Sequence, residues 1–152
     1  MEWPPGWDES WAHVGSTSNT AYYVDHERIL LVLPYPQSHD TAATARENID
    51  FQHRWFANHD DPPLLMIFFD RLASQDRAAR KIYSEDTTAP WALGFALVGG
   101  TLLSRAMGSF FLGLAKTAIP LKFFPTMPEG RTWLRSLPAK GLSKGAQGAK
   151  AP

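Results

Sequence analysis

Cysteine is absent from this chain of 152 residues, which excludes disulfide bonds, thiolate metal sites and catalysis by a thiol. The opening residues lack the basic and apolar regions of a secretory signal, so we expect a cytoplasmic protein. A phosphate-binding loop is missing too, because Gly99-Gly100 lacks the accompanying lysine and further glycines. No acid, base and nucleophile converge in one motif. We therefore expect no enzyme, no cofactor and no bound metal.

Long uninterrupted apolar segments are also missing. The most apolar stretch, residues 91–119, contains Arg105 and is divided into two short pieces by Gly99-Gly100-Thr101. Pieces of this length are typical of a buried strand followed by a core helix, and they are too short for a membrane span.

Neither sign of charge is in excess, because 15 basic residues balance 15 acidic ones. The charges are unevenly placed: residues 1–61 hold ten acids and three bases, whereas residues 116–152 hold seven bases and one acid. An acidic partner for the C-terminal end is compatible with this asymmetry. We favour a solvated surface and expect no nucleic-acid partner.

Apolar residues are present in runs that alternate between strand and helix periods. Strands are predicted at residues 21–24, 28–33, 64–69, 92–98 and 121–124, with a further one at 11–14. Helices are predicted at residues 40–58, 74–84, 102–115 and 128–137. Strands that alternate with helices imply right-handed crossovers, so the fold class is α/β, with a mixed, mainly parallel sheet of about five strands and about four helices.

The starts of the first two helices carry capping residues. Asp40 is predicted as the N-cap of the first helix and Ser74 as the N-cap of the second. Asp76 then falls in the first turn of the second helix, where the helix dipole favours a carboxylate. The inward face of the first helix is predicted to hold Ala45, Ile49, Gln52 and Phe56.

Composition divides the chain into an N-terminal extension at residues 1–19, a domain at 20–138 and a disordered tail at 139–152. The extension holds Trp3, Trp7 and Trp11 at a spacing of four, but Pro4-Pro5-Gly6 prevents a regular helix. We expect these rings to cover an edge of the core. A peptide-binding aromatic surface is the alternative.

The order of elements from Thr20 to Leu137 resembles the STAS and SpoIIAA-like superfamily of anti-sigma-factor-antagonist-like domains. The segments that carry this resemblance are Ile29-Leu30-Leu31-Val32, residues 69–80, residues 103–112, Phe123-Phe124 and Trp133-Leu134. The resemblance implies a non-catalytic protein-interaction or regulatory module of bacterial-type signalling.

The resemblance also implies a regulatory serine at the start of the helix after the central strand, which is Ser74 here. The Asp-Ser-Ser-Gly-like signature of phosphorylated members is missing from this chain. Asp76 already places a negative charge at the same helix start and would repel a phosphate. A plain helix cap is therefore the alternative for Ser74.

A charged group marks the end of the predicted central strand. It consists of Asp70, Arg71, Arg77 and Arg80, at the edge where open α/β sheets usually bind ligands. We interpret it as a candidate interaction site, and a structural ion-pair cluster is the alternative.

The predicted helix at 102–115 offers a second candidate surface. Leu102 and Leu112 fall off its apolar stripe, and Arg105 supplies part of the little polarity on its outer side. A protein partner or a second copy in a homodimer is expected to cover this surface.

A carrier of a lipid or another small apolar ligand is the alternative function. The helix at 102–115 is unusually apolar and contains Gly108 and Gly113, and the superfamily is related to CRAL-TRIO lipid carriers. A carrier needs an enclosed apolar cavity, whereas an interaction module needs only a surface.

Three histidines lie around the first predicted helix close to acidic residues. His53 and His59 are six residues apart, not the three or four that align two metal ligands on one helix face. We interpret these two, and His39, as solvated.

Overall fold

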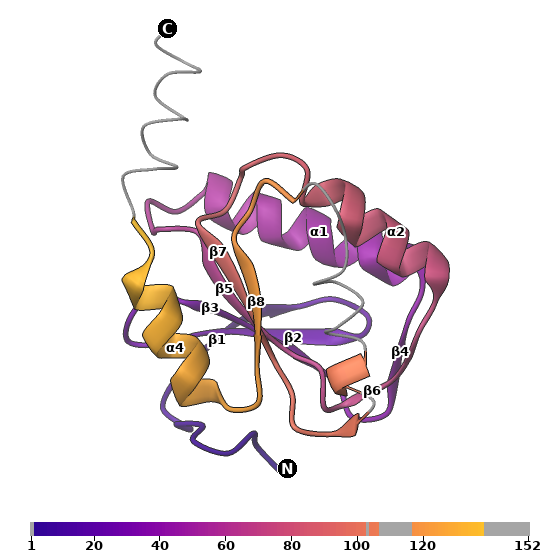
Figure 1. Cartoon of the computed structure of the whole chain (residues 1–152), viewed down its shortest axis with the longest axis horizontal. Coiled ribbons are helices and arrows are strands. Elements are labelled where there is room, and N and C mark those ends of the chain that lie inside the picture. The colour runs from indigo at the N-terminus through magenta and orange to yellow at the C-terminus, as the bar shows by residue number, and fades with distance from the viewer. Residues whose placement is uncertain (1, 103, 107–116, 139–152) are drawn as a thin grey trace, which may run out of the picture.

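A twisted sheet with helices on both faces forms the centre of the computed structural model, which describes residues 2–102, 104–106 and 117–138 (Figure 1). The main sheet has six strands in the order β1-β2-β3-β5-β7-β8. Their bounds are Ala12–Ser16, Thr20–Val24, Leu30–Pro34, Leu64–Phe68, Gly94–Val98 and Leu121–Phe124. The first three strands pair antiparallel, and the pairings from β3 to β8 are parallel. The α/β class and the mixed, mainly parallel sheet are confirmed, with β1 as an additional strand.

A second, smaller sheet was not predicted. Its strands, β4 (Ser38–Asp40) and β6 (Leu72–Gln75), pair in parallel. Both are short and largely polar, so they lack the apolar alternation by which a strand is recognised in a sequence. This pairing places Asp40 inside the protein and holds Ser74 in an extended backbone.

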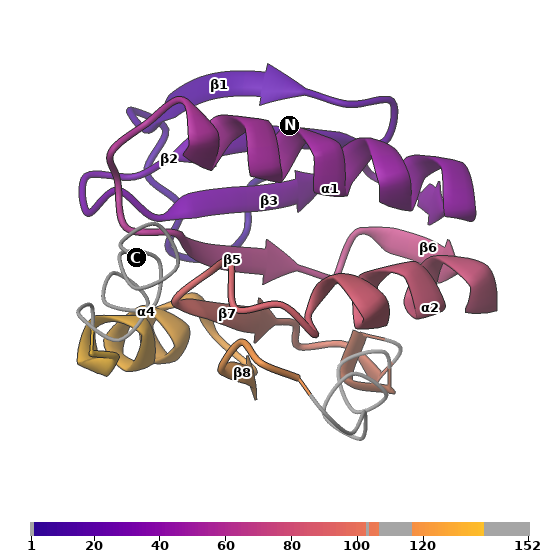
Figure 2. The same cartoon turned by 90° about the horizontal axis from the view of Figure 1, so that it is seen from above.

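Helices α1 (Ala42–Ala57) and α2 (Arg77–Asp86) cover one face of the sheet (Figure 2), and α4 (Met127–Ser136) packs on the other (Figure 1). The predicted cap of α1 was wrong by one residue. Thr41 is the N-cap, because its hydroxyl and that of Thr44 form a reciprocal capping box. Leu102 and residues 104–106 are helical, whereas the rest of the predicted helix at 102–115 is outside the described residues. The predicted tail at 139–152 is outside them as well.

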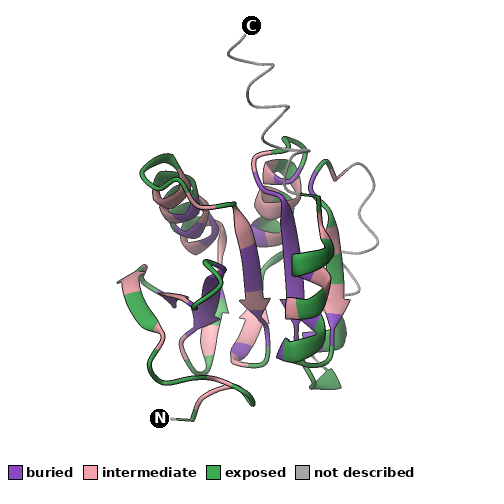
Figure 3. Cartoon of the chain, turned by 90° about the vertical axis from the view of Figure 1, so that its left-hand side faces the viewer, coloured by how far each residue is buried: buried purple, intermediate pink, exposed green. Residues whose placement is uncertain are grey.

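Two apolar clusters, one on each face, explain why the central strands are apolar without alternation. Along β3, Leu30 and Val32 face α1 and α2, while Leu31 and Leu33 belong to the cluster under α4. Figure 3 shows these buried strands between helices whose outer faces are exposed. A strand buried on both faces needs apolar residues at every position.

The N-terminal extension packs on the same face of the sheet as α4, beside that helix. Trp3 stacks on Trp7 with ring centroids 5.0 Å apart, and Trp7 contacts the rings of Tyr23 and Phe68 at 5.1 and 5.8 Å. Trp11 completes the group at 5.1 Å from Trp7. The three tryptophans therefore cover the core, as expected for this extension.

Helix α4 is fastened to the turn between β2 and β3 by ion pairs. Arg131 and Arg135 both bind the carboxylate of Glu27, and Arg131 also binds Asp25. The hydrogen bond from Arg135, assisted by Arg131, outweighs burial and lowers the pKa of Glu27 from 4.5 to about 2. Within the described residues, no helix is both long and apolar enough to cross a bilayer.

Because the pKa of Glu27 is lowered, part of the stability of the protein depends on pH and is lost in acid. A carboxyl whose folded pKa is depressed stabilises fully above its unfolded pKa, and this contribution is lost as the pH falls from about 5 to about 2. Arg135→Met removes the largest cause of the shift, so its loss of melting temperature over this range should be smaller than that of the wild type. Arg54→Met, which breaks an exposed pair with Asp50, is the control. An NMR titration that gives Glu27 an ordinary pKa in the wild type would contradict this account.

Candidate functional site

A groove lies at the carboxyl ends of the parallel strands. Its volume is about 650 Å³, and Leu33, Phe68 and Val98, near the ends of β3, β5 and β7, form its floor. The wall on one side is the N-terminal segment 2–6, and the wall on the other is the segment 125–128 at the start of α4. We call this the edge groove. It lies at the sheet edge where ligands of open α/β proteins bind.

Asp70 lines the edge groove and connects two of the segments that form it. Its carboxylate accepts hydrogen bonds from the backbone N–H of Gly100 at 2.9 and 3.0 Å and of Thr101 at 3.1 Å. Burial raises the pKa of Asp70, but the hydrogen bonds from Gly100, Ser104 and Thr101 outweigh burial and leave the pKa below its ordinary value. Asp70 is therefore a charged acceptor that joins the end of β5 to the loop after β7.

Arg71 connects the edge groove to the N-terminal segment. Its guanidinium donates to the carbonyl oxygens of Glu2 at 2.5 Å and Pro34 at 3.4 Å. Burial lowers the pKa of Arg71, against the opposing effect of the charges of Tyr23 and Glu2. The two predicted residues next to the central strand thus lie in one groove.

The other two predicted arginines lie elsewhere. Arg77 is exposed in the first turn of α2, and Arg80 donates to the carbonyl oxygen of Gln75 at 2.8 Å. Neither lines the edge groove. The predicted group of four charges is therefore divided between the groove and the start of α2.

The prediction that Ser74 is the N-cap of the second helix was wrong. Ser74 lies in β6, and α2 begins at Arg77 with Asp76 as its N-cap. The reason is the pairing of β6 with β4, which keeps the backbone of Ser74 extended, so the helix begins later in the sequence. Its hydroxyl lies 2.6 Å from Nδ1 of His39. Phosphorylation of Ser74 stays a prediction, without the support of a helix N-terminus.

The second predicted surface is described only in part. Leu102 is 89% exposed. Among the described residues, it is the large apolar residue that is exposed to solvent. Arg105 is exposed, and Leu112 is outside the described residues.

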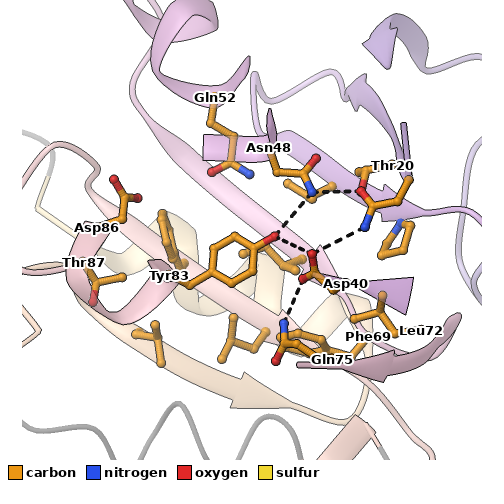
Figure 4. Close-up of a pocket in the computed structure, with 17 residues that line it drawn as sticks. Thr20, Asp40, Asn48, Gln52, Phe69, Leu72, Gln75, Tyr83, Asp86 and Thr87 are labelled. Atoms are coloured by element: carbon orange, nitrogen blue, oxygen red, sulfur yellow. Dashed lines mark hydrogen bonds between the residues drawn. The ribbon is translucent and has the colours of Figure 1, made fainter. Parts of the chain in front are cut away.

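A buried polar network was not predicted as a site. It lies between the sheet and helices α1 and α2, around the carboxylate of Asp40 (Figure 4). Oδ1 of Asp40 accepts from the hydroxyls of Thr44 at 2.6 Å and Tyr83 at 3.2 Å, and Oδ2 accepts from Nε2 of Gln75 at 3.0 Å. Asn19 Nδ2 approaches Oδ1 at 3.5 Å. Donors from helices α1 and α2, from β6 and from the turn between β1 and β2 thereby converge on one carboxylate.

Asn48 and Gln52 extend this network along α1. Asn48 accepts from the hydroxyls of Thr17 at 2.7 Å and Tyr22 at 2.9 Å, and Gln52 donates to Tyr22 at 3.1 Å. Burial raises the pKa values of Tyr22 and Tyr83, so both phenols stay protonated and can donate. A sequence signal existed, because Ala45, Asn48 and Gln52 share one helical face. Ala45 and Gln52 were assigned to the interior, and Asn48 was not.

The histidines make separate contacts. His53 Nε2 lies 2.8 Å from Asp86, and His59 Nδ1 lies 2.7 Å from the carbonyl oxygen of Trp55. Burial raises the pKa of Asp86, against the opposing effects of His53 and Trp91. In the described part of the chain, no group of three or more histidine, aspartate or glutamate side chains converges to hold a metal ion.

Residues 22–138 match a protein family described as a domain of unknown function, DUF7793. No curated protein matches the chain. One similar solved structure is an uncharacterized protein of the DUF3478 family with a SpoIIAA-like fold from Shewanella loihica PV-4, 14% identical, with 82% of this chain and 92% of that chain covered and a TM-score of 0.47. Another is apo-SiaC from Pseudomonas aeruginosa, 16% identical, with 75% and 98% covered and a TM-score of 0.41.

Proposed function

Since this chain belongs to the family described as a domain of unknown function, DUF7793, we propose its function from its own geometry: a non-catalytic, regulatory interaction module. The edge groove binds a segment of a partner protein in the cytoplasm. The observation that carries the proposal is the groove itself, with about 650 Å³ and an apolar floor. Pockets that bind ligands have volumes of about 300–1,000 Å³ and are lined mainly by apolar side chains.

The rim of the edge groove favours an apolar anchor residue on the partner. Four prolines line it, at positions 4, 5, 125 and 128. Proline has no backbone N–H and a fixed φ, so the rim is rigid and offers few donors. A rigid rim reduces the entropy lost on binding. We infer that the partner inserts one apolar side chain between the two walls.

The polar groups of the edge groove support a binding role over a catalytic one. Asp70 is already engaged with two backbone N–H groups, and its lowered pKa makes it a poor proton donor near neutral pH. Arg71 is engaged with two carbonyl oxygens. Both charges therefore hold the groove in shape.

Gly100 offers a direct test of the groove. A Cβ at this position would lie 3.8 Å from the carbonyl oxygen of Pro125 and 3.9 Å from Asp70, which is ordinary contact. Gly100→Phe should therefore fill the edge groove without a backbone clash, and Gly100→Ala is the matched control. A photo-crosslinking residue at Thr126, in cells that naturally make the protein, identifies the partner.

With that partner purified, Gly100→Phe is expected to weaken binding by about tenfold or more, and Gly100→Ala by less than about twofold. Melting temperatures of both variants should remain close to that of the wild type. Equal affinity of the wild type and the phenylalanine variant would show that the partner binds outside the edge groove. The surface around Leu102, which a homodimer would use, is one such place.

The alternative function, a carrier of a lipid or other apolar ligand, also stays a prediction. The cavity beside the polar network has a volume of about 60 Å³. A cavity that binds benzene has about 150 Å³, so this one is too small for an acyl chain. Native mass spectrometry of the purified protein would detect a lipid that remains bound.

A further inference from the structure

The apolar floor of the edge groove is covered in the described structure. Its three side chains, Leu33, Phe68 and Val98, are 1%, 3% and 6% exposed. Contact with a partner is favourable where it removes apolar area from water, and this floor presents almost none. An apolar side chain of a partner can therefore reach the floor only after one wall of the groove has moved outward.

The wall at the start of α4 is firmly attached. Met127 and Leu134 are 3% and 1% exposed, so this helix is packed into the core. Arg131 and Arg135 also connect it to Glu27, in the turn between β2 and β3. Moving this wall would break the apolar cluster on its face of the sheet, so we expect α4 to stay in place.

The wall formed by the N-terminal segment 2–6 is attached more weakly. None of its residues is buried (Figure 3). It is held by the hydrogen bond from Arg71 to the carbonyl oxygen of Glu2, at 2.5 Å, and by the stacking of Trp3 on Trp7, with ring centroids 5.0 Å apart. Segments with few buried contacts open locally at a much lower free energy than the whole fold. This wall is therefore the one that can move.

Gly6 provides the point at which this segment can turn. Its φ is +88°, and a Cβ at this position would lie 3.1 Å from Cε of Met127, so the two walls meet here. Glycine adopts many backbone conformations at low cost. The two residues before it are prolines with a fixed φ, so this part moves as one stiff unit. Trp7, which follows, packs on Phe68 and anchors the rest of the extension.

We propose that residues 2–6 form an autoinhibitory lid over the edge groove. In the closed state, which the structure shows, the lid keeps a partner away from the floor. The lid opens at Gly6, and the apolar side chain of the partner then enters between the separated walls and contacts Leu33. This inference rests on the proposed function, because it assigns the regulation of the same groove. A groove that is open in a fraction of the chains binds with an affinity reduced by that fraction.

Opening of the lid can be measured without the partner, because the chain contains no cysteine. Leu33→Cys places a thiol on the floor. Leu31→Cys is its matched control, on the same strand and in the same apolar cluster but outside the groove. The probe is dithiobis(nitrobenzoate), whose reaction with the thiol of the full chain is followed by absorbance. We expect Leu33→Cys to react at least about tenfold faster than Leu31→Cys, since its thiol needs only a local opening.

Trp3→Ala loosens the lid, and Trp3→Phe, which keeps an aromatic ring on Trp7, is its control. In the Leu33→Cys chain, Trp3→Ala should speed the reaction by about tenfold or more, and Trp3→Phe by less than about threefold. The rate of Leu31→Cys should change by less than about twofold with either substitution. Val98→Cys, a change of similar volume on the same floor, is the second probe if Leu33→Cys does not fold.

The partner that the photo-crosslink at Thr126 identifies tests whether the lid controls binding. Trp3→Ala should raise the association rate constant by about fivefold or more, because more chains then have an open groove. Loss of a contact between Trp3 and the partner would instead raise the dissociation rate constant. The two rate constants therefore separate the release of the lid from a damaged binding surface.

Two outcomes would overturn the proposal. One is a reaction of Leu33→Cys that is no faster than that of Leu31→Cys. The other is an unchanged association rate constant in Trp3→Ala while Gly100→Phe still weakens binding, which would mean that the groove binds the partner without control by the lid. If Gly100→Phe leaves binding unchanged, the proposed function is overturned instead, and the thiol reactions, which need no partner, still decide whether the lid opens.

Discussion

Replacing Phe68 with alanine is expected to lower the free energy of unfolding by about 3–5 kcal/mol. Phe68 is 3% exposed at the end of β5, which pairs with β3 on one side and β7 on the other. Its ring lies 5.8 Å from that of Trp7. Removing it would leave a cavity between the central strand and the N-terminal extension, which cannot close without moving the sheet.

Phe123→Ala is the matched control for this loss. Phe123 is partly buried on β8, which is the edge strand of the sheet. Its removal should cost less than about 2 kcal/mol, because an exposed edge can relax. Urea denaturation of both variants measures the difference. Similar losses for the two would mean that the extension does not complete the core around Phe68.

Replacing Arg131 with methionine is expected to cost about 3 kcal/mol. Its partner Asp25 has a side chain that is 0% exposed, and Arg131 itself is 14% exposed. Asp25 would keep the hydrogen bonds from the backbone N–H of Glu27 and Ile29, both at 2.9 Å, but would lose its cation. A carboxylate buried without a counter-charge is strongly unfavourable. The contact of Arg131 with the ring of Trp11, at 5.1 Å, would be lost as well.

Arg135→Met is the control that distinguishes the contribution of an exposed ion pair from that of the buried pair between Arg131 and Asp25. The side chain of Arg135 is 53% exposed, so its pairing with Glu27 should contribute less than about 1 kcal/mol near neutral pH. Adding Asp25→Asn to Arg131→Met should recover at least about half of the loss, because the unpaired charge is then gone. If Arg131→Met costs no more than Arg135→Met, the backbone donors alone satisfy Asp25.

The strands of the core were predictable because their signal is local. β8 has the predicted bounds, and β5 differs from its prediction only by the absence of Phe69. A strand buried on both faces is apolar at every position, and this pattern needs no knowledge of its neighbours. Helix α4 was likewise located to within one residue at each end.

The polar features were less predictable because they depend on distant residues. Asp70 could be placed at the end of the central strand, but its donors, Gly100 and Thr101, follow it by 30 and 31 positions. Asp40 fits the pattern of a helix cap, yet its pairing with Gln75 in the small sheet makes it the centre of a buried network. A residue type that caps helices also serves as a buried acceptor, and only the tertiary structure distinguishes the two.

The division of the main sheet into an antiparallel and a parallel half has a consequence for the order of folding. β1, β2 and β3 pair with neighbours in sequence, whereas Leu30 pairs with Leu65 and Leu65 with Phe95. Hairpins form within about 1–10 μs, and contacts between distant residues form later because closing a long loop costs more entropy. The edge groove needs β3, β5 and β7 together. A chain still emerging from the ribosome therefore cannot present this groove until β7 has joined the sheet, so the proposed binding of a partner would require all three strands to be in place.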